Sequence, residues 1–237
     1  MTRALVCMPT YNERENIDQI VPAVLAAADV DLLVIDDNSP DGTGPMVREL
    51  QKNHDRLHLL SRAGKQGLGP AYVAGFRWGL ERGYDLLVEM DADFSHQPKY
   101  LPTMIETLGV ADVSIGSRWV SGGGVENWGL HRRVLSRGGS WYARTVLGLP
   151  IRDLTAGFVG WRRSVLEAID LEAVGAKGYV FQIEMKYRAS LLGHSVREFP
   201  IIFPDRVAGD SKMSGKIVLE AMAAVAGLPR RVAKGDR

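Results

Sequence analysis

Short apolar runs alternate with segments of helical periodicity through the first half of the chain. The runs at 4–8, 31–37, 57–62, 85–93 and 111–118 are rich in Val, Ile and Leu and predict strands. The segments at 13–28, 43–53, 70–83 and 99–109 predict helices. Strands that are apolar throughout are buried on both faces, which is typical of a mainly parallel sheet with helices on either side. The fold class is therefore α/β, and ligands of such sheets bind beyond the carboxyl ends of the strands.

The second half of the chain has a less regular pattern. Residues 131–148 predict a helix interrupted near Gly138 and Gly139, and Trp141, Tyr142 and Val146 are expected in the core. A strand leading into a helix is predicted over 155–169, a helix over 180–193, a strand over 194–203 and an apolar helix over 216–228. We expect one catalytic domain over 1–212, followed by a C-terminal helix and basic tail over 213–237.

Composition narrows the function classes. The net charge of +1 over 237 residues gives no basic field of the kind that nucleic-acid binding requires. Cys7 is the single cysteine, so no disulfide forms within the chain, which fits a reducing compartment. The first residues do not resemble a signal peptide, and no run of about 18 apolar residues predicts a membrane span. We expect a cytoplasmic protein.

Two carboxylates, Asp91 and Asp93, end the predicted strand in "LLVEMDADFSHQP". Side chains two apart on a strand face the same way, so these acids would repel unless a cation lies between them. A hard divalent cation takes such oxygen ligands and keeps positions for a substrate phosphate. The alternative is a solvated turn in which Asp93 or Ser95 caps the next helix. The tripeptide alone leaves both interpretations open.

Two other predicted strands also end in polar residues, in "PTYNERE" at 9–15 and "DDNSPDGT" at 36–43. Tyr11 is placed to stack on a base, and Glu13 or Asp37 to accept hydrogen bonds from a base or ribose. Taken singly, these segments also fit a helix N-terminus and an Asx turn. Their coincidence with the acidic pair favours a nucleotide-diphosphate site. A nicotinamide-binding fold is disfavoured, because no Gly-x-Gly-x-x-Gly follows the first strand.

The ordered motifs resemble the polyprenol-phosphate (dolichyl-phosphate) mannosyltransferases, which are GT-A glycosyltransferases of family 2 with a Rossmann-like sheet. The resemblance rests on "MPTYNERENI", "VIDDNSPDGT", "GKQGLGPAY", "MDADFSHQP", "GSRWVSGGGV", "DLTAGFVGW", "GYVFQIEMKYRA" and "DRVAGDSK". It implies inverting transfer of mannose from GDP-mannose to a polyprenyl monophosphate lipid, with Mg²⁺ or Mn²⁺ as the cofactor. The rival activities are transfer of glucose to polyprenyl phosphate, other family 2 reactions with a UDP-sugar donor, and a catalytically silent binding subunit.

The resemblance also implies residue roles on the donor side. Asp91, Ala92 and Asp93 would border the diphosphate and the metal. Ser95 stands where some relatives have Gln as a further metal ligand. The guanosine part would lie against Pro9, Tyr11, Glu13, Ile35 and Asp37.

Arginines are expected to hold the acceptor phosphate, because their forked donors match its oxygens. The candidates are Arg118, Arg132 and Arg206, with Ser136 one helical turn from Arg132 and Lys212 as a point charge. Asp153 is assigned a positioning role against the sugar or the arginines. Its alternative is a loop acid that caps the following segment.

A lipid acceptor requires the enzyme to visit a membrane surface. Residues 215–227, followed by Arg230, Arg231 and Lys234, suit an interfacial helix with a basic flank, although a helix packed on the core fits as well. We expect peripheral association at the cytosolic face of a membrane. Some relatives that lack spans depend on an integral membrane partner protein.

Overall fold

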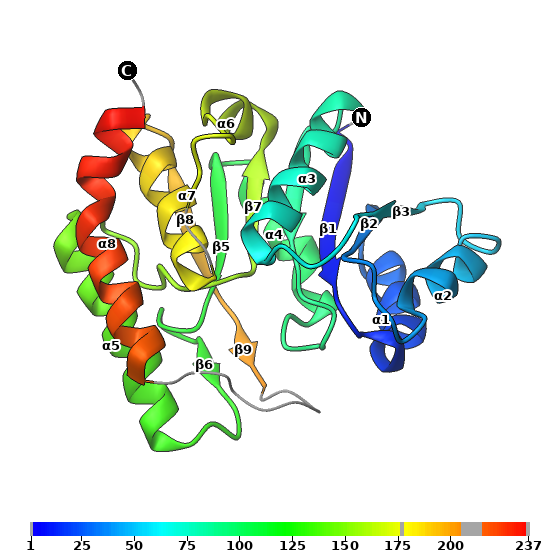
Figure 1. Cartoon of the computed structure of the whole chain (residues 1–237), viewed down its shortest axis with the longest axis horizontal. Coiled ribbons are helices and arrows are strands. Elements are labelled where there is room, and N and C mark those ends of the chain that lie inside the picture. Colours follow the sequence, from blue (N-terminus) through cyan, green and yellow to red (C-terminus); the bar gives the residue numbers. More distant parts are fainter. Residues whose placement is uncertain (1, 176–177, 205–214, 236–237) are drawn as a thin grey trace.

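The computed structural model describes residues 2–175, 178–204 and 215–235. Its main sheet has seven strands in the order β3-β2-β1-β4-β7-β5-β8 (Figure 1). All neighbouring strands are parallel except β7, which runs antiparallel to both β4 and β5. The strands are β1 Ala4–Thr10, β2 Asp31–Asp36, β3 Leu57–Ser61, β4 Leu86–Glu89, β5 Val113–Ser117, β7 Val159–Arg162 and β8 Val196–Pro200.

Helices cover both faces of this sheet, as the alternation of strands and helices predicts. Along β1, Leu5 and Cys7 face one apolar core while Val6 and Met8 face the other. The first core includes residues of α3, α5, α6, α7 and α8, and the second includes residues of α1 and α4. The helices are α1 Arg14–Ala27, α2 Thr43–Leu50, α3 Leu68–Glu81, α4 Leu101–Leu108, α5 Leu130–Leu147, α6 Arg163–Ala168, α7 Tyr179–Leu191 and α8 Gly215–Gly235.

Helix α3 packs closely on β1 and β4 because it has glycines where it meets them. A Cβ atom on Gly79 would lie 2.7 Å from Leu87 and 2.9 Å from Leu5. A Cβ atom on Gly75 would lie 2.5 Å from Ile35. Real Cβ atoms do not come this close to a packed side chain, so larger residues would push α3 off the sheet.

Three details of the sequence prediction are wrong. Strand β4 ends at Glu89, so Asp91 and Asp93 lie on the loop that follows and not on the strand. The predicted strand at 194–203 is two short strands, β8 and β9 Ile202–Phe203, and β9 pairs with β6 Gly124–Val125 in a separate small sheet. Helix α5 is continuous through Gly138 and Gly139.

Helix α5 keeps its regularity through tertiary packing. Consecutive glycines weaken an isolated helix by about 1 kcal/mol each. Their cost is offset here because Ala143 and Leu147 are buried in the first core. Helix α8 lies beside α5 and α7 at one end of the molecule (Figure 1).

The C-terminal helix belongs to the same core as the sheet. Its residues Val225, Leu228 and Val232 are buried with those of α5 and α7. None of the helices in the described part of the chain has the length and apolar character needed to cross a bilayer.

Candidate active site

The acidic loop after β4, residues 90–97, orders its carboxylates through short local contacts. Asp93 Oδ1 accepts hydrogen bonds from the Ser95 amide at 3.1 Å and from the Ser95 hydroxyl at 2.5 Å. The preceding Asp91 Oδ1 accepts a hydrogen bond from the Tyr72 hydroxyl at 3.4 Å. Phe94, between Asp93 and Ser95, has a positive φ of 59°. The loop therefore turns sharply, and its hydroxyl contacts orient both acids.

The hydrogen bonds of Asp91 define where the protons of Tyr72 and His96 lie. Burial, followed by the nearby charge of Asp91, raises the pKa of Tyr72 well above its ordinary value, so the phenol stays protonated and donates to Asp91. The Asp91 amide donates to His96 Nδ1 at 2.9 Å, so that nitrogen carries no proton. His96 is buried and its ring stacks on Phe158. These contacts make His96 a structural support of the acidic loop.

The loop can supply a divalent cation with carboxylate oxygens from Asp91 and Asp93. Within the described ranges, no cluster of three or more His, Cys, Asp or Glu side chains is arranged to hold a metal ion. Two carboxylates fit a cation whose remaining positions are taken by water and substrate phosphate. Ser95 is buried and its hydroxyl donates to Asp93, so the structure shows it orienting one of these acids.

The residues expected to hold the nucleoside differ in their solvent exposure. Tyr11 is 37% exposed, and Lys65 Nζ lies 4.1 Å from the centre of its ring. Pro9 is half-buried next to it. Tyr11 is therefore placed to stack on a base at the end of β1.

The acidic side chains on this side already have partners within the chain. Asp37 is buried and accepts a hydrogen bond from Arg62 Nη1 at 2.6 Å. Glu13 Oε2 accepts one from Asn16 Nδ2 at 2.8 Å. A nucleoside would share these carboxylates with Arg62 and Asn16.

Ile35 has no exposed surface in the structure. Its side chain is fully buried below α3, and its backbone pairs with Pro9 in the sheet.

Arg118, which follows β5, is held by a buried carboxylate. Its Nε and Nη2 donate to the two oxygens of Asp153 at 2.8 and 2.7 Å, and Nη2 also donates to the Thr155 hydroxyl at 2.9 Å. Burial alone would raise the pKa of Asp153, but the charge and hydrogen bonds of Arg118 outweigh it and lower that pKa. The Asp153 carboxylate is therefore ionised and fixes the plane of the guanidinium. The structure thus brings Asp153 together with Arg118, and the positioning role of Asp153 stays a prediction.

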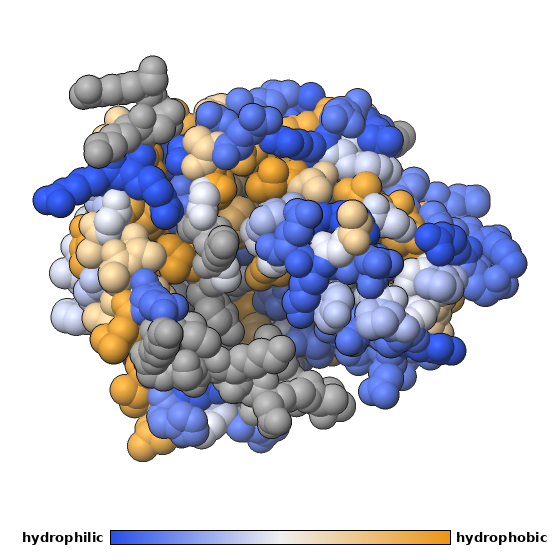
Figure 2. Space-filling view, in the orientation of Figure 1, coloured by the Kyte–Doolittle hydropathy of each residue, from blue (hydrophilic) through white to orange (hydrophobic). Residues whose placement is uncertain are grey.

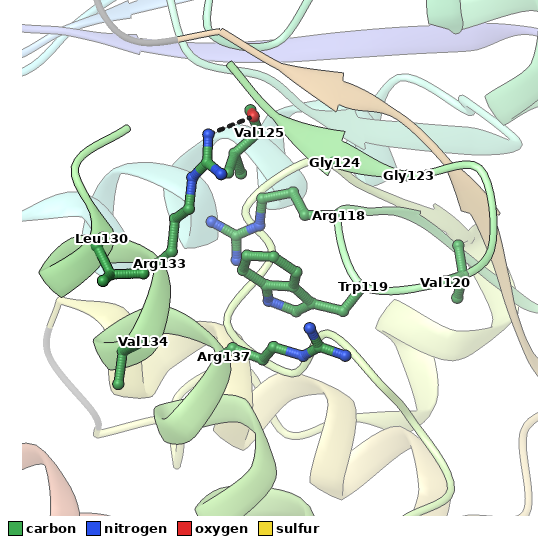
Figure 3. A pocket seen from close by; sticks show the side chains of 10 residues that line it. All are labelled: Arg118, Trp119, Val120, Gly123, Gly124, Val125, Leu130, Arg133, Val134 and Arg137. Atoms are coloured by element: carbon green, nitrogen blue, oxygen red, sulfur yellow. Dashed lines mark hydrogen bonds between the residues drawn. The ribbon is translucent and has the colours of Figure 1, made fainter. Parts of the chain in front are cut away.

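A pocket of about 480 Å³ opens beside Arg118 (Figure 3). Arg118 and Trp119 project into it from the segment after β5, while Arg133 and Arg137 come from α5. Its apolar wall includes Val120, Leu130 and Val134, and the remaining lining residues are Gly123, Gly124 and Val125. The pocket thus combines cationic and apolar surface, which suits an anion with an apolar tail.

Buried indole groups add donors around this pocket. The Nε1 atoms of Trp119 and Trp128 are buried and find no hydrogen-bond acceptor among the described residues. A buried N–H without an acceptor is costly, so an anion placed near them would relieve that cost. Arg118 lies 5.6 Å from the Trp119 ring centre and 5.7 Å from that of Trp128.

The α5 arginines that line the pocket are not the one named from the sequence. Arg132 lies 3.9 Å over the Trp128 ring and does not line the pocket, and neither does Ser136. Arg133 and Arg137, which were not among the candidates from the sequence, do line it. Their spacing of four residues puts them on one helical face, but Arg132 and Ser136 have the same spacing, so the sequence alone does not choose between the two pairs. Arg206 and Lys212 lie outside the described residues.

The acidic loop and the pocket meet at Phe203 of β9. Its ring centre lies 5.5 Å from that of His96 and 5.5 Å from the guanidinium carbon of Arg118. The two halves of the site are thus neighbours although Asp93 and Arg118 lie on different strand ends.

The expectation that Trp141 is a core residue is wrong. Trp141 is 66% exposed, and Leu130 and Val134 on the same helix are 77% and 63% exposed. Val146 is also partly exposed, and Tyr142 donates to the Met222 carbonyl of α8 at 3.1 Å. The outward stripe of α5, defined as Leu130, Val134 and Trp141, is therefore apolar.

The sheet order, the acidic loop after β4 and the helices on both faces give the chain the GT-A fold. Solved structures with this architecture are similar over nearly the whole chain. A glucosyl-3-phosphoglycerate synthase from Mycobacterium tuberculosis has a TM-score of 0.64 at 17% identity, covering 97% of this chain and 79% of that one. A mannosyltransferase from Pyrobaculum calidifontis has a TM-score of 0.58 at 16% identity, covering 99% and 73%.

The chain belongs to glycosyl transferase family 2, whose model matches residues 5–170. A polyprenol monophosphomannose synthase from Mycolicibacterium smegmatis is 53% identical over 227 residues, covering 94% of this chain and 86% of that protein. An undecaprenyl-phosphate mannosyltransferase from Micrococcus luteus is 50% identical over 224 residues, covering 94% and 92%.

Proposed function

We propose that the chain transfers mannose from GDP-mannose to a polyprenyl monophosphate, which yields polyprenyl-phosphate mannose and GDP. The observation that carries this proposal is the pocket beside Arg118, because it joins three arginines to an apolar wall next to the acidic loop. A sugar acceptor with many hydroxyls would not need such a wall. A lipid phosphate needs both surfaces.

The relatives support mannose and a polyprenyl acceptor. The two closely similar sequences are named for a polyprenol and an undecaprenyl phosphate product or acceptor, and both names specify mannose. The P. calidifontis structure contains GDP-mannose and Mn²⁺, and the M. tuberculosis structure contains Mn²⁺ and UDP-glucose. Their shared fold supports a divalent cation in this chain, held by Asp91 and Asp93.

The donor half would bind GDP-mannose through aromatic and acidic groups. Tyr11 offers a stacking surface for guanine, with Lys65 above the ring as a cation near the nucleotide. Pro9, Glu13 and Asp37 would border the nucleoside, and Ile35, which is fully buried, would support Pro9 from the neighbouring strand. Bound Mg²⁺ or Mn²⁺ would act as a Lewis acid that neutralises the departing diphosphate. Ser95 and Tyr72 keep Asp93 and Asp91 oriented toward it.

The acceptor half would deliver the nucleophile. A phosphate oxygen of the lipid attacks C1 of mannose, and the bond from C1 to the GDP diphosphate breaks with its electron pair staying on the diphosphate. The phosphate is already anionic near neutral pH, so it needs little help from a general base. Arg118 would donate to it from Nη1, because Nε and Nη2 are bonded to Asp153 and Thr155, with Arg133 and Arg137 at the pocket wall and Arg206 and Lys212 as further proposed contacts. One in-line displacement inverts the configuration at C1.

The outward stripe of α5 would place this pocket at a membrane surface. Leu130 and Val134 belong both to the stripe and to the pocket wall. Leu219 and Met222 of α8 are also exposed, and Figure 2 shows apolar side chains along the edge that α5 and α8 form. Apolar residues beside arginines suit peripheral binding to an anionic leaflet, which we place at the cytosolic face.

The test is a turnover assay with the purified chain, polyprenyl monophosphate in vesicles, and Mg²⁺ or Mn²⁺. We expect labelled mannose from GDP-mannose to appear in the lipid fraction, and a chelator to abolish transfer. UDP-glucose is the alternative donor, tested in the same assay for comparison with GDP-mannose. Faster transfer from UDP-glucose would replace the donor proposal, and chelator-resistant transfer would overturn the role of the cation.

A further inference from the structure

Helix α7 carries charged side chains into the interior of the protein. Residues 180–189 are all buried, including Gln182, Glu184, Lys186 and Arg188. Buried charges destabilise a fold unless they are paired or hydrogen-bonded, so each of these groups needs a partner. Gln182 and Lys186 contact residues next to the active site, whereas Glu184 and Arg188 bond to each other.

Lys186 binds the backbone of the segment that supports Arg118. Its ammonium group is fully buried and donates to the Ala156 carbonyl at 2.7 Å and the Leu154 carbonyl at 3.2 Å. A further donor contact goes to the Gln182 carbonyl within α7, at 3.3 Å. The ammonium group also lies 3.4 Å from Gln182 Oε1, so its three donors are shared among four acceptors.

The segment that Lys186 binds is the one that orients the acceptor arginine. Asp153 and Thr155 alternate with Leu154 and Ala156 along it, and both contact the Arg118 guanidinium. The Asp153 amide is also fixed, since it donates to Glu198 Oε1 at 2.9 Å. Lys186 therefore holds the carbonyls of the same short segment whose side chains hold Arg118.

Glu89 connects this arrangement to the acidic loop. It lies at the end of β4 and accepts hydrogen bonds from Gln182 Nε2 and, at 2.7 Å, from Trp161 Nε1. Burial raises the pKa of Glu89 and lowers that of Lys186, while the attraction between the two charges opposes both shifts. Removing one charge alone would leave the other uncompensated.

We propose that Lys186 is a positioning residue for the acceptor half-site, which sets the orientation of Arg118 through the backbone of residues 154–156. The inference rests on the proposed function, because it assigns Arg118 to the acceptor phosphate. It predicts that substitution of Lys186 weakens binding of the acceptor phosphate and does not affect binding of GDP-mannose.

The test compares Lys186→Met with Arg188→Met. We expect Lys186→Met to raise the KM for polyprenyl phosphate about 10- to 100-fold, since misplacement of a binding group by about 1 Å has effects of that size. The Kd for GDP-mannose should stay within about twofold. Arg188 is a matched control, because it is a buried cation of the same helix that bonds Glu184 at 3.1 Å and the Ala173 carbonyl at 3.0 Å. Its variant should lose thermal stability but keep the acceptor KM.

A second variant separates positioning from charge compensation. Glu89→Gln combined with Lys186→Met removes both buried charges, so it should recover a large part of the lost melting temperature while the acceptor KM stays raised. A wild-type acceptor KM in the folded double variant would overturn the inference, as would equal KM changes in the Lys186 and Arg188 variants. An inactive wild-type enzyme would instead refute the proposed function.

Discussion

The two halves of the site differ in the strands that support them. The donor half lies at the ends of β1, β2 and β4, which are parallel neighbours, and its chemistry comes from loops that directly follow those strands. The acceptor half lies around β5, β7 and β9 and takes its arginines from a loop and from a helix. One half is built by neighbouring strand ends, while the other is assembled from distant segments. Substitutions in the donor half and in the acceptor half should therefore have distinguishable kinetic effects.

The largest effect is expected from Asp93→Asn in the donor half. Loss of a carboxylate ligand to the cation removes several kcal/mol of stabilisation of the leaving diphosphate, so kcat should fall about 10³-fold. Asp55→Asn changes an exposed acid far from the site and serves as the control. A kcat within tenfold of the wild type for Asp93→Asn, measured in the mannose-transfer assay, would remove the acidic loop from the reaction.

A smaller effect is expected from the α5 arginines in the acceptor half. Arg133→Gln and Arg137→Gln should each raise the acceptor KM about 3- to 10-fold, because one charge-assisted contact at a partly exposed site is lost. Arg144→Gln is the matched control, since Arg144 is an exposed arginine of the same helix that does not line the pocket. Equal KM changes in all three variants would indicate general attraction to the membrane and not binding in the pocket.

The smallest effect on catalysis is expected from the outward stripe of α5. Trp141→Ser should weaken binding to anionic vesicles about tenfold, while kcat with a short-chain, water-soluble acceptor stays unchanged. Val110→Ser alters an exposed apolar residue outside α5 and is the control. Vesicle flotation measures both variants. Unchanged flotation of Trp141→Ser, or the same loss in Val110→Ser, would contradict a membrane-facing α5.

The difference between the halves also explains what the sequence could predict. Strands β1, β2 and β4 are continuous apolar runs, and the polar residues after them mark the donor site directly. The antiparallel position of β7 depends on pairing with strands far away in the sequence, which no local pattern reports. Strand β4 also ends earlier than its apolar run predicted, so the loop and not the strand pleat orients Asp91 and Asp93.

Residues of the acceptor half are harder to predict for a physical reason. Helix α5 has a polar and an apolar residue on almost every turn, so periodicity alone does not tell Arg132, which covers Trp128, from Arg133 and Arg137, which line the pocket. Lys186 looks like one polar residue in a helical stripe, and only the tertiary structure shows that it binds the segment behind Arg118. Trp141 was assigned to the core because aromatic residues in helices usually are.

The separation of the two halves is tested most directly by calorimetric titration of GDP-mannose in the presence of Mn²⁺. The account predicts that Asp93→Asn abolishes cation-assisted binding, while Arg118→Lys, which changes only the acceptor half, keeps the wild-type Kd within about twofold. Binding of equal strength without Mn²⁺, or the same loss of affinity in both variants, would contradict it.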